Sequence, residues 1–163
     1  MSSSDGGDVR AEILDLGDQR LLAAEIIIDA PANVIFDILV QPQRHIDVDG
    51  QRSVQSVISG PERLTLGSKF TMGMRLGVRY RITSTVLEFV PNKRITWAHL
   101  LGNRWSYDLT ALSPTQTLVR ETNDLKAAGW RGRLSPVARN PEGMRKAIAK
   151  SLVRLKAMAE AST

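Results

Sequence analysis

Three side chains in this 163-residue sequence combine reactive groups with places on strand faces that are otherwise apolar: His99, Tyr107 and Glu121. A histidine in such a place can donate or accept a proton near neutral pH. Burial raises the pKa of a carboxyl group, which can then act as an acid or a base. These three are the candidate catalytic residues, and a hydrogen-bonded structural role is the alternative for His99.

Two carboxylates, Glu88 and Glu121, lie on such strand faces, and for both an ion pair is the alternative to catalysis. Arg79, Arg81 and Arg120 lie on the same stretches of the chain. An arginine beside a carboxylate keeps it charged and gives it a structural role. From the sequence alone we favour the ion pair for both carboxylates.

Large apolar side chains alternate along the same strands and are typical of a ligand cavity. Methionine adapts to irregular shapes, and tryptophan and tyrosine combine an apolar body with one polar tip. Ordinary core packing is the alternative. The candidate ligand-binding residues are Phe70, Met72, Met74, Trp97, His99, Trp105, Tyr107, Leu152 and Leu155.

Metal and cofactor chemistry find little support in the sequence. The chain has no cysteine, and its two histidines, His45 and His99, are far apart. The run Asp47-Val48-Asp49-Gly50 matches part of a calcium loop but lacks the remaining ligands, so it predicts a turn. No glycine-rich phosphate loop or nucleophile elbow is present. We therefore expect no metal site and no cofactor.

Strands and helices that could position these residues follow from the apolar spacing. A β-branched run predicts a strand over Leu21–Asp29, Pro31 begins a helix that ends at Val40, and a short turn follows at Pro42–Ile46. Alternating residues and short turns then predict an antiparallel meander. Its strands are expected over Arg52–Ser59, Ser68–Leu76, Val78–Val90, Arg94–Leu101, Trp105–Leu109 and Thr117–Asp124.

The last part of the chain predicts a loop and a long helix. The loop spans Ala127–Arg139, and Asn140 is a suitable N-cap for a helix with Pro141 in its first turn. An apolar stripe runs from Met144 to Ala159, and its burial is expected to hold the helix on the sheet. We expect residues 1–19 to be a flexible segment, mostly disordered, and residues 20–163 to form one domain.

The net charge is +5, with an acidic start and a basic end. A basic end can bind nucleic acid or an anionic membrane surface, but a solvated helix face is the interpretation that we favour. The aromatic residues do not alternate with the basic residues as they do in single-strand binders, so an obligatory nucleic-acid partner is not expected. No apolar run is long enough to span a bilayer, and no signal-peptide pattern is present, so we expect a cytoplasmic protein.

Several short motifs resemble the START/Bet v 1-like (SRPBCC) superfamily, in particular its bacterial polyketide cyclase/dehydrase and lipid-transport-like branch. The motifs are Ile28-Asp29-Ala30-Pro31, Gly67-Ser68-Lys69-Phe70, Pro91-Asn92-Lys93-Arg94-Ile95-Thr96-Trp97 and Thr117-Leu118-Val119-Arg120-Glu121-Thr122. The resemblance implies an α+β helix-grip fold. A curved antiparallel sheet of six to seven strands would wrap around the C-terminal helix, with one or two short helices after the first strand.

The resemblance also implies a cavity between the sheet and the helix. Our first hypothesis is that the cavity binds a small hydrophobic molecule such as a lipid or a polyketide, in a monomer or a homodimer. The first alternative is a polyketide cyclase or dehydratase that uses the same cavity. The second is an interaction protein that acts through its basic C-terminal region, for example at an anionic surface.

Overall fold

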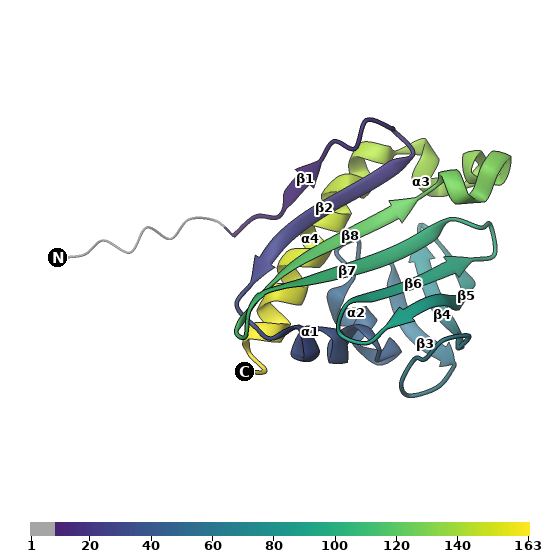
Figure 1. The fold of residues 1–163 in the computed structure, drawn as a ribbon. Helices are drawn as coiled ribbons and strands as arrows, with labels where there is room; N and C mark the ends of the chain where they lie inside the picture. The colour runs from purple at the N-terminus through teal and green to yellow at the C-terminus, as the bar shows by residue number, and fades with distance from the viewer. Residues whose placement is uncertain (1–8) are drawn as a thin grey trace.

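An eight-stranded antiparallel sheet curves around one long helix in the computed structural model, which describes residues 9–163 (Figure 1). The sheet order is β1-β2-β8-β7-β6-β5-β4-β3, so the first strands of the chain lie beside the last one. The strands are β1 (Glu12–Leu14), β2 (Leu21–Ile28), β3 (Val54–Ser59), β4 (Lys69–Leu76), β5 (Val78–Val90), β6 (Arg94–His99), β7 (Arg104–Ser113) and β8 (Gln116–Asp124).

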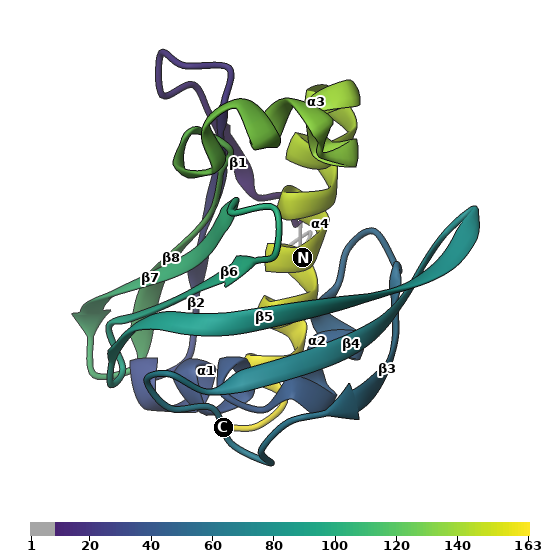
Figure 2. The same ribbon diagram turned by 90° about the vertical axis from the view of Figure 1, so that its right-hand side faces the viewer.

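The helices lie on the concave side and at the two ends of the sheet (Figure 2). At one end α1 is followed by η1 and α2, and at the other end η2 and α3 lead into α4. The bounds are α1 (Ala32–Leu39), η1 (Pro42–Arg44), α2 (His45–Val48), η2 (Lys126–Leu134), α3 (Pro136–Arg139) and α4 (Pro141–Glu160). The α+β helix-grip fold predicted from the sequence is confirmed.

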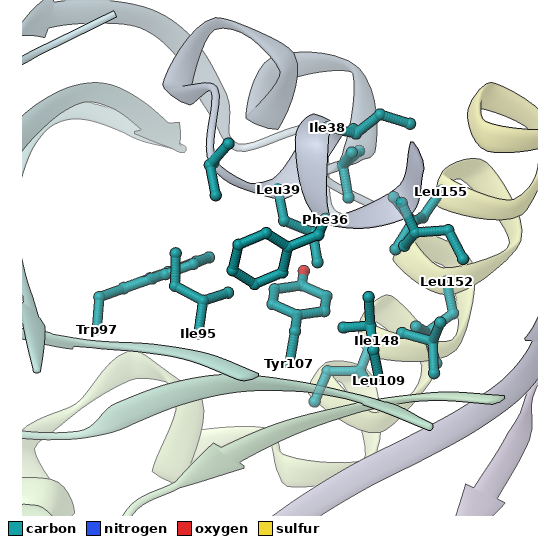
Figure 3. Close-up of a cluster of buried hydrophobic side chains, with 14 of the residues drawn as sticks. Phe36, Ile38, Leu39, Ile95, Trp97, Tyr107, Leu109, Ile148, Leu152 and Leu155 are labelled. Atoms are coloured by element: carbon teal, nitrogen blue, oxygen red, sulfur yellow. The ribbon is translucent and has the colours of Figure 1, made fainter. Parts of the chain in front are cut away.

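Helix α4 begins and packs as its sequence indicates. The side chain of Asn140 accepts a hydrogen bond from the Gly143 amide at 2.9 Å, which is the predicted N-cap. Ile148, Leu152 and Leu155 are fully buried against the sheet, and each contributes about 1.5–3 kcal/mol to stability. Figure 3 shows these three side chains facing Leu109 of β7. Within residues 9–163, no helix is both long and apolar enough to cross a membrane.

Two segments differ from the sequence-based expectation. Strand β1 lies within residues 1–19, which we expected to be flexible, because Glu12–Leu14 pairs with β2 through the backbone and leaves little side-chain pattern. With β1 included, the sheet has eight strands instead of six or seven. The expected loop 127–139 contains the helical turns η2 and α3. Residues 1–8 lie outside the described part.

Gly50 follows α2 and touches α4 so closely that only a hydrogen atom fits. A Cβ atom at this position would collide with the carbonyl oxygen of Ala147 and lie 2.5 Å from the amide nitrogen of Ser151. The Gly50 amide also donates a hydrogen bond to Ser151 Oγ at 2.8 Å. This contact fixes the segment after α2 on the helix that the sheet surrounds.

We therefore expect Gly50→Ala to lower the free energy of unfolding by about 3 kcal/mol or more, because a helix backbone cannot move aside as a side chain can. The control is Gly77→Ala in the β4–β5 turn, where φ is +74° and nothing lies within 4 Å of the new methyl group. That variant should lose only about 1–2 kcal/mol, from backbone strain. Urea unfolding measures both, and equal losses would contradict the close contact.

Candidate functional site

Glu121 is a carboxyl group buried in the interior with one oxygen unused. It lies on the concave face of β8, with Tyr107 of β7 on one side and Ala24 of β2 on the other, and its side chain is 1% exposed. The indole Nε1 of Trp105 donates a hydrogen bond to Glu121 Oε1 at 2.8 Å. Among residues 9–163, Oε2 has no hydrogen-bond partner. The Tyr107 side chain also interacts with this carboxyl group, without a hydrogen bond of normal geometry to Oε2. Since buried polar atoms are normally paired, Oε2 can pair with another molecule.

The protonation of Glu121 follows from its surroundings. Burial raises the pKa of Glu121 to about 8, although the interactions with Trp105 and Tyr107 oppose the rise. The negative charge of Asp49, at the end of α2, raises the pKa further. The carboxyl group is therefore mostly neutral at neutral pH, and its Oε2 can carry a proton that a ligand oxygen would accept.

Asn123, two residues further along β8, has a second buried polar atom that can bind another molecule. It is fully buried between Leu22 of β2 and Trp105 of β7. Its Oδ1 accepts only a long hydrogen bond, 3.5 Å, from Asn103 Nδ2. Its own Nδ2 has no partner among the residues that the structure describes. Asn123 can therefore donate a hydrogen bond on the same face as Glu121.

A histidine and a serine extend this polar region across β5 and β6. Ser84 Oγ lies 2.7 Å from His99 Nδ1, and the His99 ring centroid lies 6.3 Å from that of Trp105. Burial lowers the pKa of His99 to about 4, so the ring is neutral at physiological pH. His99 can then donate a hydrogen bond but is a weak base.

These side chains form what we call the interior polar cluster: Ser84, His99, Asn103, Trp105, Tyr107, Glu121 and Asn123. The cluster lies toward the end of the sheet that η2 covers, where the β6–β7 turn at Gly102 packs against Ala128. His99 and Trp105 are only partly buried, so the cluster reaches the protein surface.

Aromatic side chains fill the neighbouring part of the interior, toward α1 and α2. The His45 ring stacks on Trp97 at 5.1 Å between centroids, and its Nε2 donates a hydrogen bond to the Leu39 carbonyl at 2.7 Å. Phe70 meets the edge of Trp97 at 5.8 Å. Figure 3 shows Trp97 and Tyr107 rising from the sheet toward Phe36. This region is packed core.

The candidate ligand-binding residues fall into three places. His99, Trp105 and Tyr107 belong to the interior polar cluster, and Trp97 lies beside it. Phe70, Met72, Leu152 and Leu155 are buried in the core. Met74 is half-buried on β4 opposite Tyr80, away from the cluster.

The ion pair that we favoured for Glu121 is wrong. Arg120 precedes it on the same strand and therefore points to the opposite face, where its Nη2 lies 2.9 Å from Glu25 Oε2. Glu88 does form an ion pair, at 2.7 Å, but with Arg94. Strand alternation could have excluded Arg120, whereas the partner of Glu88 depends on the register between β5 and β6.

Sequence reasoning missed Asn103, Asn123, Ser84 and Asp49. Asn123 has the same strand parity as Glu121, and this signal could have revealed it. The run Asp47–Gly50 was predicted as a turn, but Asp47 and Val48 are the last residues of α2, and only the chain after them turns. The Asp49 carboxylate accepts hydrogen bonds from the amides of Ser53 and Val54. Its charge nevertheless acts on Glu121 and Tyr107, and only the fold shows this.

Two surface pockets lie outside the interior polar cluster. A pocket of about 440 Å³ is lined by residues of α1 and by Arg44, Arg63, Asn92 and Ser162. A pocket of about 300 Å³ is lined by Arg20 and by residues of the η2 and α3 segment, including Trp130 and Arg133. Neither includes a predicted ligand-binding residue. Within residues 9–163, no group of three or more histidine, aspartate or glutamate side chains could hold a metal ion.

Solved structures that superimpose on this chain identify its fold. Protein Ms6760 from Mycobacterium smegmatis superimposes with a TM-score of 0.71 over 95% of this chain and 100% of its own, at 16% identity. An AHSA1-like protein from Aeromonas hydrophila gives a TM-score of 0.57 over 86% of this chain and 93% of its own, at 17% identity. At such low identity the likeness establishes the fold alone, which is the helix-grip fold.

A sequence relative exists in Mycobacterium tuberculosis. The uncharacterized protein Rv0088 of strain H37Rv is 41% identical over 125 residues, which cover 76% of this chain and 55% of the relative. The uncharacterized protein MT0096 of strain CDC 1551 is 40% identical over the same length. The chain thus spans about half the length of the curated relatives it matches. No family model matches it.

The raised pKa of Glu121 predicts a pH-dependent stability. The folded chain holds this proton up to about pH 8, whereas the unfolded chain releases it near its ordinary pKa of 4.5. The free energy of unfolding should therefore fall as the pH rises toward 8, by up to about 1.4 kcal/mol per pH unit. We choose the range from about pH 6.5 to 8, because the stabilising effect of the lowered His99 pKa is complete above about pH 6.5.

Glu121→Gln should abolish this slope, because glutamine keeps the acceptor for Trp105 and has no proton to lose. Urea unfolding of both proteins at several pH values measures the effect. The control is Glu12→Gln in β1, an exposed carboxylate, which should keep the slope of the parent protein. Parallel profiles for the parent and Glu121→Gln would contradict the neutral carboxyl group.

Proposed function

We propose that the chain binds a small, mostly apolar molecule that carries a carbonyl or hydroxyl oxygen, with that oxygen at the interior polar cluster. The single observation that carries the proposal is that Glu121 Oε2 and Asn123 Nδ2 lie unpaired on one buried face. Both can donate a hydrogen bond, since the carboxyl group is neutral at physiological pH. A ligand oxygen would satisfy them and recover the cost of their burial.

Apolar side chains beside the cluster would contact the rest of such a ligand. Leu22 and Ala24 of β2 flank Asn123 and Glu121, and Trp97 and Tyr107 lie toward the aromatic core. Small-molecule sites usually combine an apolar wall with a few polar groups that fix the orientation of the ligand. The solved structures that resemble this chain have a Bet v 1-like fold, and such a fold is compatible with ligand binding. A lipid or a polyketide has the required chemistry.

A matched pair of probes tests the proposal: 2-acetylnaphthalene, which has a carbonyl oxygen, and 2-ethylnaphthalene, which has the same shape without it. The protein should bind the ketone about tenfold more tightly, because only the ketone pairs with the buried donors. Asn123→Leu should reduce this preference, and Thr122→Val, on the opposite face of β8, should retain it. Equilibrium dialysis measures both affinities.

Two results would overturn ligand binding at this site. One is equal affinity of the parent protein for the two probes. The other is the absence of binding to either probe, together with the absence of any organic molecule released when the purified protein is denatured and extracted.

Catalysis is the second candidate function, and the neutral state of Glu121 favours it. A neutral carboxylic acid in an apolar site can donate its proton to a substrate oxygen. In a dehydratase-like reaction, Glu121 would protonate the hydroxyl group as it leaves as water, and the resulting carboxylate would accept the proton lost from the adjacent carbon as the double bond forms. Asn123 would hold the neighbouring carbonyl oxygen. The low pKa of His99 makes the neutral ring a hydrogen-bond donor to the substrate in preference to a base.

Dehydration of 4-hydroxy-4-(2-naphthyl)butan-2-one to the conjugated enone, followed by absorbance, tests this candidate. Turnover should fall as the pH rises through about 8, where Glu121 loses its proton. Glu121→Gln should abolish turnover while the affinity for 2-acetylnaphthalene changes little, since glutamine still donates a hydrogen bond. A chain that binds the ketone but dehydrates nothing is a binding protein.

A further inference from the structure

The segment that leads into α4 combines exposed apolar side chains with unopposed positive charge. Residues 125–141 contain Lys126, Arg131, Arg133 and Arg139 and no acidic residue. Trp130 is 70% exposed and Leu134 59% exposed, although the same segment buries Ala128 and Gly132. A tryptophan this exposed loses its main stabilising contribution, so its position indicates a surface that becomes covered by something else.

The geometry of η2 holds Trp130 at the surface. Gly129 has φ +56° and ψ −134°, which interrupts the helical turns between the buried Ala128 and the exposed Trp130. The guanidinium of Arg131 lies 5.7 Å from the centre of the Trp130 ring. Trp130 and Arg133 also line the pocket of about 300 Å³ together with Arg20. A ring and cationic groups thus share one small area.

The β6–β7 turn, which contains Leu100, packs beside η2. The turn lies beside the residues that precede α3 in both views, and a Cβ atom at Gly102 would lie 3.2 Å from Ala128 Cα (Figures 1 and 2). Leu100 is 87% exposed, and Arg104 beyond the turn is exposed too. We define the Trp130 patch as Leu100, Trp130, Arg131, Arg133 and Leu134.

The nearby acidic groups do not neutralise this patch. Asp18 is paired with Arg20 at 3.1 Å and with Lys126 at 3.5 Å, and Asp124 Oδ1 accepts the Lys126 amide at 2.8 Å. Within residues 9–163, Arg131 and Arg133 form no ion pair. The unpaired positive charge therefore faces outward beside Trp130, and it complements an anionic surface.

We propose that the Trp130 patch docks the protein on the surface of a bilayer that contains anionic phospholipids. Trp130, Leu134 and Leu100 enter the interfacial layer, while Arg131 and Arg133 contact the lipid phosphates. Tryptophan favours the interface between headgroups and acyl chains, and arginine binds phosphate through its planar fork of donors. Aromatic and aliphatic side chains beside basic residues, within a segment without acidic ones, are typical of an interfacial anchor.

The inference is independent of the proposed ligand. From the sequence, contact with an anionic surface was an alternative for the whole basic C-terminal region. The present proposal places that contact at η2. Three of the five basic residues of α4 are partly buried and already bonded: Arg145 to Glu142, Arg154 to the carbonyls of Asp47 and Asp49, and Lys156 to Glu160. The exposed apolar residues that a bilayer needs lie in η2 and in the β6–β7 turn. The proposal therefore predicts that η2, more than α4, controls membrane binding.

Cosedimentation of the full chain with vesicles tests the proposal. One vesicle preparation contains phosphatidylcholine alone, and the other an equimolar mixture with phosphatidylglycerol. We expect binding to the mixed vesicles only, with a shift of Trp130 fluorescence to shorter wavelength. Trp97 is buried, and Trp105 is partly buried with its indole Nε1 bonded to Glu121, so neither should contribute much to the shift.

Variants separate apolar insertion from simple charge attraction. Arg131→Glu with Arg133→Glu should lower the partition coefficient about 25-fold or more, since each basic residue at an anionic surface contributes about fivefold. Trp130→Ser should lower it about tenfold and remove the fluorescence shift. The control with the same charge change is Lys69→Glu with Lys93→Glu, two exposed lysines on other parts of the sheet, which should retain binding within about twofold.

Circular dichroism checks that each variant is folded. Three outcomes would overturn the proposal: no binding to mixed vesicles, binding that Trp130→Ser leaves unchanged, or equal losses for the η2 variant and the lysine control. Binding of a DNA duplex in the absence of any vesicle binding would assign the patch to nucleic acid and also overturn it.

Discussion

The pairing of β2 with β8 is the constraint on which the remainder of the structure depends. It joins the beginning and the end of the sheet, from Leu21 opposite Asp124 to Ile28 opposite Thr117. Helix α4 is then fastened along β2, where Lys156 Nζ donates a hydrogen bond to the Ile27 carbonyl at 3.0 Å and the Asp29 amide donates one to Glu160 at 2.8 Å. Without the pairing of β2 with β8, β2 would not lie in the sheet, and α4, which is bonded to β2, would not be held against the concave face.

Closure of the sheet on α4 determines the chemistry of the inward-facing residues. Arg120 and Glu121 are adjacent in the chain, yet Arg120 is exposed to water and paired with Glu25, whereas Glu121 is buried and neutral. The difference arises because successive residues of a strand point to opposite faces and only one face is covered. The unpaired atoms of Glu121 and Asn123 are thus a consequence of the fold that a ligand could relieve.

The two ends of the sheet differ in how they are sealed. At the α1 end, aromatic rings pack on one another, with Phe36 and Phe89 at 5.4 Å and His45 stacked on Trp97. At the η2 end, the aromatic rings of His99 and Trp105 are mixed with polar side chains under a short irregular segment, and both rings remain partly accessible. The interior polar cluster and the Trp130 patch lie at this second end.

Much of the fold could be predicted from the sequence, because local patterns record which face of an element is buried. The β-branched run before Pro31, the alternation in β4 to β8 and the N-cap Asn140 are local signals, and each is confirmed. Strand β1 was missed because its three residues are too few to show an alternating pattern, although they pair with the backbone of β2. The helical turns of η2 were missed because two glycines and three basic residues resemble a loop.

The sequence by itself determined the fold class, through the motifs that resemble a known superfamily. It also indicated the candidates His99, Tyr107 and Glu121, since alternation shows which side chains share a face. Only the tertiary structure decided what surrounds them. It brought Trp105, Asn123 and the charge of Asp49 to Glu121, excluded Arg120, and left one carboxyl oxygen unpaired. The physical reason is that a pKa and a hydrogen bond depend on distance and burial between residues far apart in the chain, and no local pattern contains these quantities.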